Sequence, residues 1–187
     1  MGLWSVLVAG MPAAAVVAPA AGVLLVAGPE LSDPRFHEAV VLVVSHDARG
    51  TAGVILNRPS RLSLAEAAPA IGHQEALSYG GPLAPRALLV LVRTLEPPPA
   101  PALRVFADIY LTGVEELTVW PVARRQESRY RVFSGYAGWA PGQLDRELAQ
   151  GDWLVTQAKE GDVFAEVPGE LWRQLAVPVG VAPPEGR

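Results

Sequence analysis

The chain has 187 residues, with 19 acidic and 15 basic side chains and a formal net charge of −4. This charge argues against a dedicated nucleic-acid-binding protein, because such proteins usually carry a basic face. The chain contains no cysteine, which excludes disulfides, thiolate metal sites and a cysteine nucleophile. Half of its residues are apolar, enough to bury one sizeable core at this length.

Residues 1–21 form an uncharged extension that we expect to be disordered. A targeting segment is the alternative for these residues. Pro12 and Pro19 would interrupt a membrane-spanning helix, and no basic residue precedes the apolar stretch. We therefore expect a cytoplasmic protein without a membrane segment. Residues 22–176 are predicted to form one domain and residues 177–187 a disordered tail.

Short apolar runs rich in β-branched residues predict buried strands in the first half of the chain. These runs cover residues 22–27, 39–44, 52–57 and 88–92. The second and third runs flank a turn at residues 46–50 and predict a hairpin. Ser63 and Glu66 have the spacing of a capping box, which predicts a short helix ending near Gly72.

The second half of the chain continues the mixture of strands and short helices. We predict strands at residues 106–111, 130–134 and 153–157, and helices at residues 142–150 and 170–175. Thr112 and Glu115 have the spacing of a second capping box. Strands outnumber helices and come in hairpin-like pairs. The expected fold is therefore α+β with a largely antiparallel sheet.

The stretch from Gly135 to Leu144 predicts a structural corner. Its glycines favour a tight turn, Trp139 is expected to anchor that turn, and Pro141 and Gly142 favour a helix start. The residues that we assign to this structural signature are Gly135, Gly138, Trp139, Gly142, Gln143 and, further along the chain, Trp153.

Several motifs together resemble the YqgE/AlgH family of bacterial proteins. In chain order they are Gly22-Val23-Leu24-Leu25-Val26-Ala27, Asp33-Pro34-Arg35-Phe36, Gly53-Val54-Ile55-Leu56-Asn57-Arg58-Pro59, Tyr79-Gly80-Gly81-Pro82 and Gly135-Tyr136-Ala137-Gly138-Trp139. The resemblance extends from about residue 22 to residue 175 and is weak between residues 94 and 131. It implies a bifurcated sheet curled into a pseudo-barrel, with a few short helices around it. The family is associated with transcriptional regulation, without an agreed DNA-binding element or an established enzymatic activity.

Polar residues near predicted strand ends are the first candidate site. Their side chains, beside an open glycine backbone, could form a pocket for an anionic or carbonyl-bearing ligand. The alternative is that they organise turns and pair locally. The candidates are Asp33, Arg35, His46, Asn57, Arg58, Gly80 and Gly81.

A basic cluster is the second candidate site. It comprises Arg124, Arg125, Arg129 and Arg131. On a strand, Arg129 and Arg131 would project from one face, as contacts to nucleic-acid phosphates require. The alternative is a solvated strand edge protected by charge. The acidic net charge favours this alternative, and we do not expect direct DNA binding.

The sequence predicts no catalytic set, metal site or cofactor. Ser45, His46 and Asp47 are adjacent, so their side chains would alternate along a strand and cannot form a triad. His37, His46 and His73 lack metal-ligand spacing. We therefore predict a non-enzymatic regulatory or interaction protein, acting through an unidentified protein or small molecule. The alternative is a small-molecule binding protein, or a hydrolase, that uses the strand-end residues. The oligomeric state does not follow from the sequence.

Overall fold

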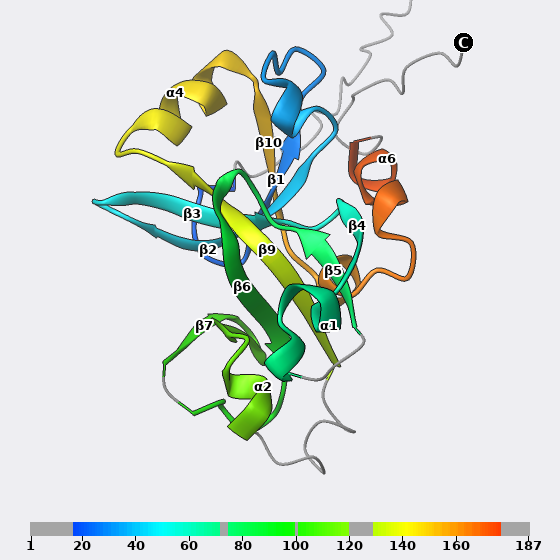
Figure 1. The fold of residues 1–187 in the computed structure, drawn as a ribbon. Helices are drawn as coiled ribbons and strands as arrows, with labels where there is room; N and C mark the ends of the chain where they lie inside the picture. The colour runs from blue at the N-terminus through cyan, green and yellow to red at the C-terminus, as the bar shows by residue number, and fades with distance from the viewer. Residues whose placement is uncertain (1–16, 72–74, 100, 120–128, 177–187) are drawn as a thin grey trace, which may run out of the picture.

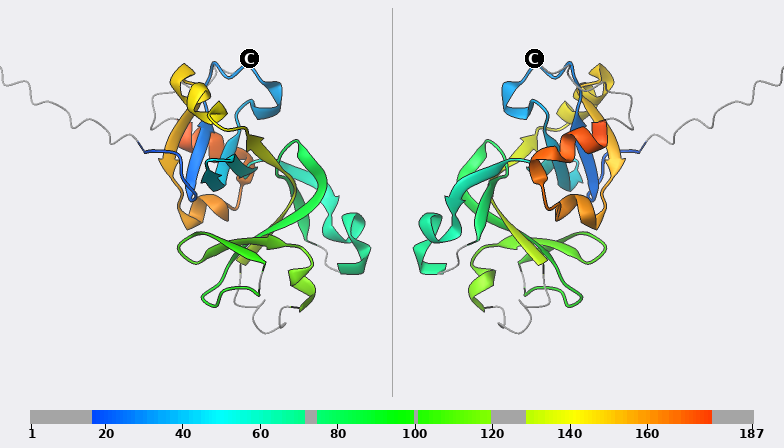
Figure 2. Two further views of the ribbon diagram at one scale, coloured as in Figure 1. Left: turned by 90° about the vertical axis from the view of Figure 1, so that its left-hand side faces the viewer. Right: turned by 90° about the vertical axis from the view of Figure 1, so that its right-hand side faces the viewer.

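A computed structural model describes residues 17–71, 75–99, 101–119 and 129–176. These residues form a ten-stranded, largely antiparallel sheet with short helices around it (Figure 1). The main strand order is β10-β1-β2-β3-β9-β6-β8-β7, and β4 and β5 branch from it at β9. The views in Figure 2 show that the sheet curls in its lower part, where the green strands of residues 83–113 lie. The predicted α+β fold with a bifurcated, curled sheet is confirmed.

Four strands build one half of the sheet. They are β1 (Val23–Ala27), β2 (Val40–Asp47), β3 (Gly50–Ile55) and β10 (Trp153–Gln157). The β2–β3 pair is the predicted hairpin, and β1 lies between β2 and β10. All five residues of β1 and the first five of β2 are buried, which explains why both strands read as unbroken apolar runs.

The other half contains β6 (Leu83–Arg93), β7 (Ala102–Phe106) and β8 (Ile109–Gly113). A separate pair, β4 (Pro59–Ser63) and β5 (Ala76–Tyr79), joins the sheet through a parallel pairing of β5 with β9. The strand predicted over residues 106–111 is wrong. Ala107 adopts a φ of 44°, and the chain turns there between β7 and β8.

Strand β9 (Arg129–Trp139) connects the two halves, as its diagonal course in Figure 1 shows. It pairs with β6 up to Tyr136 and with β3 from Ala137 onward. The change of partner follows Gly135, whose φ of 69° bends the strand. The tight turn expected at this place is therefore wrong. The glycines bend a continuous strand, which becomes a shared element of both halves.

The helices are short and lie around the sheet. They are α1 (Leu64–Ala67), α2 (Glu116–Val119), α4 (Gln143–Gln150), α5 (Glu160–Val163) and α6 (Leu171–Ala176). The Ser63–Glu66 capping box is present at α1. The second predicted capping box is wrong, because Thr112 belongs to β8 and its hydroxyl donates to the carbonyl of Pro101.

Two groups of buried side chains form the interior. The larger one lies under β1, β2, β3 and β10 and extends to Leu91 and Phe133. The smaller one lies on the opposite face of β6 and β9, where α1 and α2 contribute Leu64 and Leu117. Since side chains alternate along β9, Val132 faces the smaller group while Phe133 faces the larger one. Arg131 shares the face of Phe133.

Candidate functional site

Asp33 and Arg35, two of the predicted ligand contacts, bind each other on an exposed turn. Asp33 caps the 3-10 helix Pro34–Phe36 by accepting the backbone N–H of Arg35 at 2.9 Å. The Arg35 Nη2 donates to Oδ2 of Asp33 at 2.6 Å. The side-chain hydrogen bonds from Arg35 lower the pKa of the Asp33 carboxyl. The two charges therefore largely compensate each other locally.

His46, Asn57 and Arg58 also make local hydrogen bonds. The Nδ1 atom of His46 lies 2.7 Å from Oγ1 of Thr51, across the β2–β3 hairpin. Asn57 is buried and holds the chain before β2, because its Oδ1 accepts the N–H of Val40 and its Nδ2 donates to a carbonyl. The Arg58 guanidinium donates to the carbonyl of His37, in the loop before β2. Burial lowers the pKa of Arg58.

Gly80 and Gly81 do not offer the open backbone that we expected. A Cβ on Gly80 would lie 2.2 Å from the carbonyl oxygen of Gly135, so the two backbones are in direct contact. Gly80 also donates to Ser134 and accepts from Ile55. The glycines thus allow β9 to approach closely. The structure does not bring these seven residues together around one hollow. Of the seven, Asp33 and Arg35 line one of the hollows described below.

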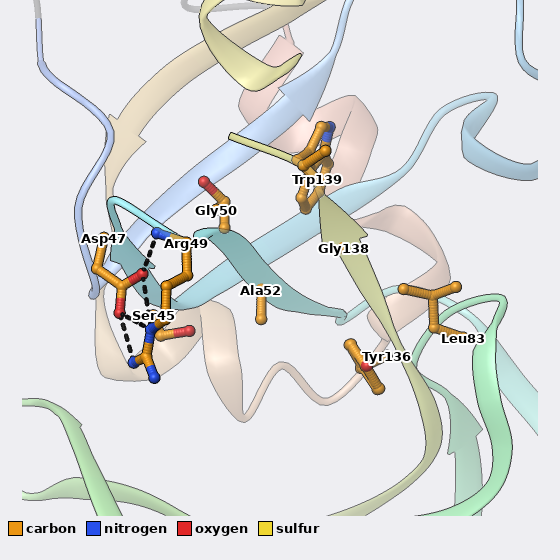
Figure 3. Close-up of a pocket in the computed structure, with 11 residues that line it drawn as sticks. Ser45, Asp47, Arg49, Gly50, Ala52, Leu83, Tyr136, Gly138 and Trp139 are labelled. Carbon is orange, nitrogen blue, oxygen red and sulfur yellow. Dashed lines mark hydrogen bonds and ion pairs between the residues drawn. The ribbon is translucent and has the colours of Figure 1, made fainter. Parts of the chain in front are cut away.

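A shallow groove of about 520 Å³ crosses β3 and β9 (Figure 3). Asp47 and Arg49 face each other on one side of Ala52, and Leu83 and Tyr136 lie on the other (Figure 3). Arg49 donates to Asp47 at 2.7 Å and lowers the pKa of that carboxyl. Because this pair is exposed and its charges cancel, the groove has no strong electrostatic preference for a ligand.

A cluster of aromatic side chains explains Trp139, Gln143 and Trp153 of the sequence signature. The Trp139 and Trp153 rings are 5.8 Å apart, and Phe36 packs against both. Both indole N–H groups donate to Oε2 of Glu147 at 2.8 Å, and Gln143 donates to its Oε1. A hollow of about 260 Å³ adjoins this cluster, next to the Asp33–Arg35 pair. The hydrogen bonds inside the cluster make it an anchor between β9, β10 and α4.

The largest of the three hollows lies beside Arg131, at the start of β9. Its volume is about 600 Å³, within the usual range of small-molecule sites. Three separate parts of the chain supply its walls: β4 and β5, the start of β9, and the segment after α5. Ala76 and Arg129 are exposed, so the cavity opens to solvent on their side.

The Arg131 guanidinium is largely buried in the wall of this cavity. Its Nη1 donates to the carbonyl of Val163 at 2.8 Å, and its Nη2 donates to the carbonyl of Leu56 at 2.7 Å and to the Ser78 hydroxyl at 3.0 Å. The guanidinium carbon lies 4.9 Å from the centre of the Phe133 ring. All three acceptors are neutral. Burial lowers the pKa of Arg131 to about 10, so the side chain remains charged at neutral pH.

Within the described residues, no carboxylate forms an ion pair with Arg131. A buried charge normally has a counter-charge, because transfer out of water costs several kcal/mol per ion. Here hydrogen bonds and the Phe133 ring reduce that cost without neutralising the charge. The wall of the cavity therefore keeps a positive potential that an anion can satisfy.

Arg129 lies two residues before Arg131 and at the mouth of the cavity. It is about half exposed, forms a 3.6 Å ion pair with Glu160 and lies over the ring of Phe164. The other polar wall contains Glu75, which accepts a hydrogen bond from the Tyr130 hydroxyl. The predicted phosphate-contacting face is thus divided: Arg129 reaches solvent, whereas Arg131 points inward. Arg124 and Arg125 lie outside the described residues.

The alternation of residues 129–132 is a sequence signal for this cavity, and it is also compatible with a charged strand edge. Arg129 and Arg131 alternate with Tyr130 and Val132, which we read as a charged strand edge. The alternation also places both arginines on the face of Phe133, and a buried Phe on that face points to a buried arginine. Ser78 and Phe164 carried no signal, because only the fold brings these distant segments to β9.

Among residues 17–71, 75–99, 101–119 and 129–176, no group of three His, Asp or Glu side chains is placed to hold a metal ion. In the same residues, no helix is long and apolar enough to cross a membrane. At the cavity itself, the polar groups are the largely buried Arg131, the exposed Arg129, the Ser78 hydroxyl, and Glu75 with its partner Tyr130. That set can recognise an anion.

The branched, curled antiparallel sheet is an AlgH-type fold. The AlgH-like family model (DUF179) matches residues 24–184, and this chain belongs to that family. A UPF0301 protein of Streptomyces avermitilis is 38% identical over 164 residues, which cover 82% of this chain and 83% of the relative. A UPF0301 protein of Myxococcus xanthus is 35% identical and covers 86% of this chain and 91% of its own length.

Two solved structures have the same fold. Protein DIP2367 from Corynebacterium diphtheriae has a TM-score of 0.70 and 27% identity, covering 89% of this chain and 93% of its own. The AlgH protein from Pseudomonas aeruginosa has a TM-score of 0.68 and 26% identity, covering 86% and 89% of the two chains. These likenesses establish family and fold. The names of these relatives state no ligand or reaction.

Proposed function

We propose that this chain is a non-enzymatic binding protein for a small organic anion, which it holds in the cavity beside Arg131. The observation that carries the proposal is the largely buried, charged Arg131 side chain with three neutral hydrogen-bond acceptors. An anion in the cavity would supply the missing counter-charge. Charge-assisted hydrogen bonds from a guanidinium are about twice as strong as neutral ones.

The position of Arg131 in the fold supports a regulatory role for anion binding. Arg131 already joins the end of β3, strand β5 and helix α5, three parts distant in sequence. A ligand that contacts the same parts would stabilise their arrangement, because it binds only the folded state. A protein partner that senses this arrangement would respond to the ligand. Any effect on gene expression would then be indirect, inside the cytoplasm and without direct DNA recognition.

The test is a titration of the purified protein with hexanoate, succinate and hexyl phosphate, followed by NMR and by thermal unfolding. We expect saturable binding of at least one of these anions and a matching rise in the unfolding temperature. Arg131→Met should weaken that binding at least tenfold, because it removes the cation and keeps an apolar side chain in its place.

Arg49→Met is the matched control. Arg49 is exposed on the β2–β3 hairpin and pairs with Asp47, away from the cavity. Its replacement should leave the anion affinity within twofold of the unsubstituted protein. If none of the three anions binds, or if both variants bind as the original does, the proposed function is wrong.

A further inference from the structure

The charges lining the cavity set a limit on the charge of its ligand. Among the described residues, the charged lining consists of Arg129, Arg131 and Glu75, and the Glu75 carboxylate binds Tyr130 on the face of the sheet opposite to Arg131. Arg129 shares the Glu160 carboxylate, which reduces its attraction for a ligand. A monoanion matches this wall. A second negative charge on the ligand would have to leave water beside the apolar part of the wall, which is costly without a cation to pair with it.

Apart from Ser78 and Tyr130, the other lining residues are apolar. They are Pro59, Ala76, Leu77, Phe164, Ala165 and Pro168. A volume of about 600 Å³ is far larger than a carboxylate alone requires. Burying apolar ligand surface against these side chains stabilises a complex by roughly 25 cal/mol per Å². The cavity thus has room for an apolar body attached to the anionic group.

The donors also favour a carboxylate over a phosphate. Arg131 is the buried cation, and Ser78 adds one hydroxyl, which can donate to a ligand oxygen if it releases Arg131. Phosphate sites in proteins use several cations or a row of backbone N–H groups around three oxygens. Apart from Arg131, the described cationic lining is Arg129, which is already paired. One carboxylate needs only one guanidinium.

Resting on the proposed function, we infer that the ligand is a monocarboxylate with an aliphatic or aromatic body. The carboxylate binds Arg131, and the body lies along the wall formed by β5 and the segment after α5. A second negative charge would have no unpaired cation beside it among the described lining residues, so dicarboxylates and phosphate monoesters bind more weakly. The site thereby distinguishes a carboxylate from a phosphate monoester that has an apolar body of similar size.

The experiment is an NMR titration with acetate, butanoate, hexanoate and octanoate, beside succinate and hexyl phosphate. We expect the dissociation constant to fall with each added methylene by up to about fourfold, as for a fully buried CH₂ group. Hexanoate should bind at least tenfold more tightly than succinate or hexyl phosphate. Arg131→Met should abolish binding of the whole series.

Ala76→Trp tests the apolar wall without changing Arg131. Ala76 is exposed in β5 and lines the cavity, so an indole there fills the space intended for the body and leaves the core unchanged. This variant should bind acetate within threefold of the original and lose the gain with chain length. Its circular dichroism and unfolding temperature confirm folding, and it keeps the test valid if Arg131→Met does not fold.

The outcomes separate the two proposals. Binding that depends on Arg131 but prefers hexyl phosphate or succinate, or that ignores chain length, leaves the anion site intact and overturns the monocarboxylate inference. A chain-length effect that persists in Ala76→Trp also overturns it, because the body would then lie elsewhere. Binding that is unchanged by Arg131→Met overturns both.

Discussion

A Cβ atom on Gly81 would lie 2.2 Å from the carbonyl carbon of Tyr136, so the backbone before β6 is in direct contact with β9. Gly81 also has a φ of 151°. The close contact of Gly81 with β9 and its positive φ both occur beside the place where β9 bends and changes its partner strand. This contact joins the β4–β5 branch to the bend at Gly135, and it positions β5 beside the cavity.

Gly81→Ala should therefore destabilise the protein strongly. The substitution combines a backbone clash with left-handed strain, and we expect a loss of about 3 kcal/mol or more in the free energy of unfolding. Urea denaturation followed by circular dichroism measures it.

Gly151→Ala is the control for conformation alone. Gly151 ends α4 with a φ of 82°, and a Cβ there would meet nothing within 4 Å. This variant should lose only the left-handed penalty, about 1 kcal/mol. Equal losses in the two variants would contradict a packing role for Gly81.

The same region shows what the sequence could predict and what it could not. Local signals were sufficient for β1, β2 and the capping box at Ser63, because apolar runs and cap spacing act within a few residues. The glycines at 135 and 138 predict a tight turn, whereas the structure places both in the bent strand β9. Their purpose depends on β3 and β6, which lie far away in the chain.

The candidate site was harder to predict for the same reason. Asp33 and Asn57 are polar residues near strand ends, which makes them candidate ligand contacts. Asp33 instead caps the turn beside it, and Asn57 binds the backbone of Val40, 17 residues earlier in the chain. Arg131 looked like a surface charge because sequence alone does not show that Leu56, Ser78 and Val163 surround it. Local hydrogen bonding was foreseeable as an alternative; convergence of distant segments was not.

Glu147→Ala should weaken the aromatic anchor. Glu147 accepts both indole N–H groups and the Gln143 amide, and Trp139 and Trp153 are buried. Removing the acceptor leaves two donors without a partner, with an expected loss of about 2–4 kcal/mol in the free energy of unfolding. Tryptophan fluorescence during urea unfolding reports both the stability and the packing of the rings.

Two further variants make the Glu147 result specific. Glu147→Gln keeps one oxygen that can accept the indoles, so it should lose about half as much. Glu166→Ala replaces an exposed carboxylate outside the cluster and should change stability by less than about 0.5 kcal/mol. A loss in Glu147→Gln as large as in Glu147→Ala would mean that the negative charge matters more than the acceptor.

Asp33→Asn should have a small, pH-dependent effect. The hydrogen bonds from Arg35 lower the pKa of Asp33 in the folded state, so this carboxylate stabilises the fold above its unfolded pKa of about 3.9. The contribution is lost as the pH falls through the lower folded pKa. Because Asn is an equally good N-cap, only the ion pair is removed, with a loss of about 0.2–1 kcal/mol at pH 7.

The difference between Asp33→Asn and the original protein should disappear at low pH, where the carboxyl is protonated in both states. It should also shrink in concentrated salt, because the pair is partly exposed. Urea denaturation over a range of pH measures it, and Arg35→Ala provides the other side of a double-mutant cycle. A difference that grows as the pH falls would contradict the assigned direction of the pKa shift.

Arg131→Lys separates the charge of Arg131 from its geometry. A lysine ammonium keeps the positive charge, but it is a compact group that cannot reproduce the planar spread of donors to Leu56, Ser78 and Val163. Two carbonyls from different elements compete for one ammonium, so the free energy of unfolding should fall by about 1–3 kcal/mol. Hexanoate should still bind, about tenfold more weakly, whereas Arg131→Met should not bind it. If lysine and methionine weaken hexanoate equally while both variants remain folded, the guanidinium geometry rather than its charge holds the anion.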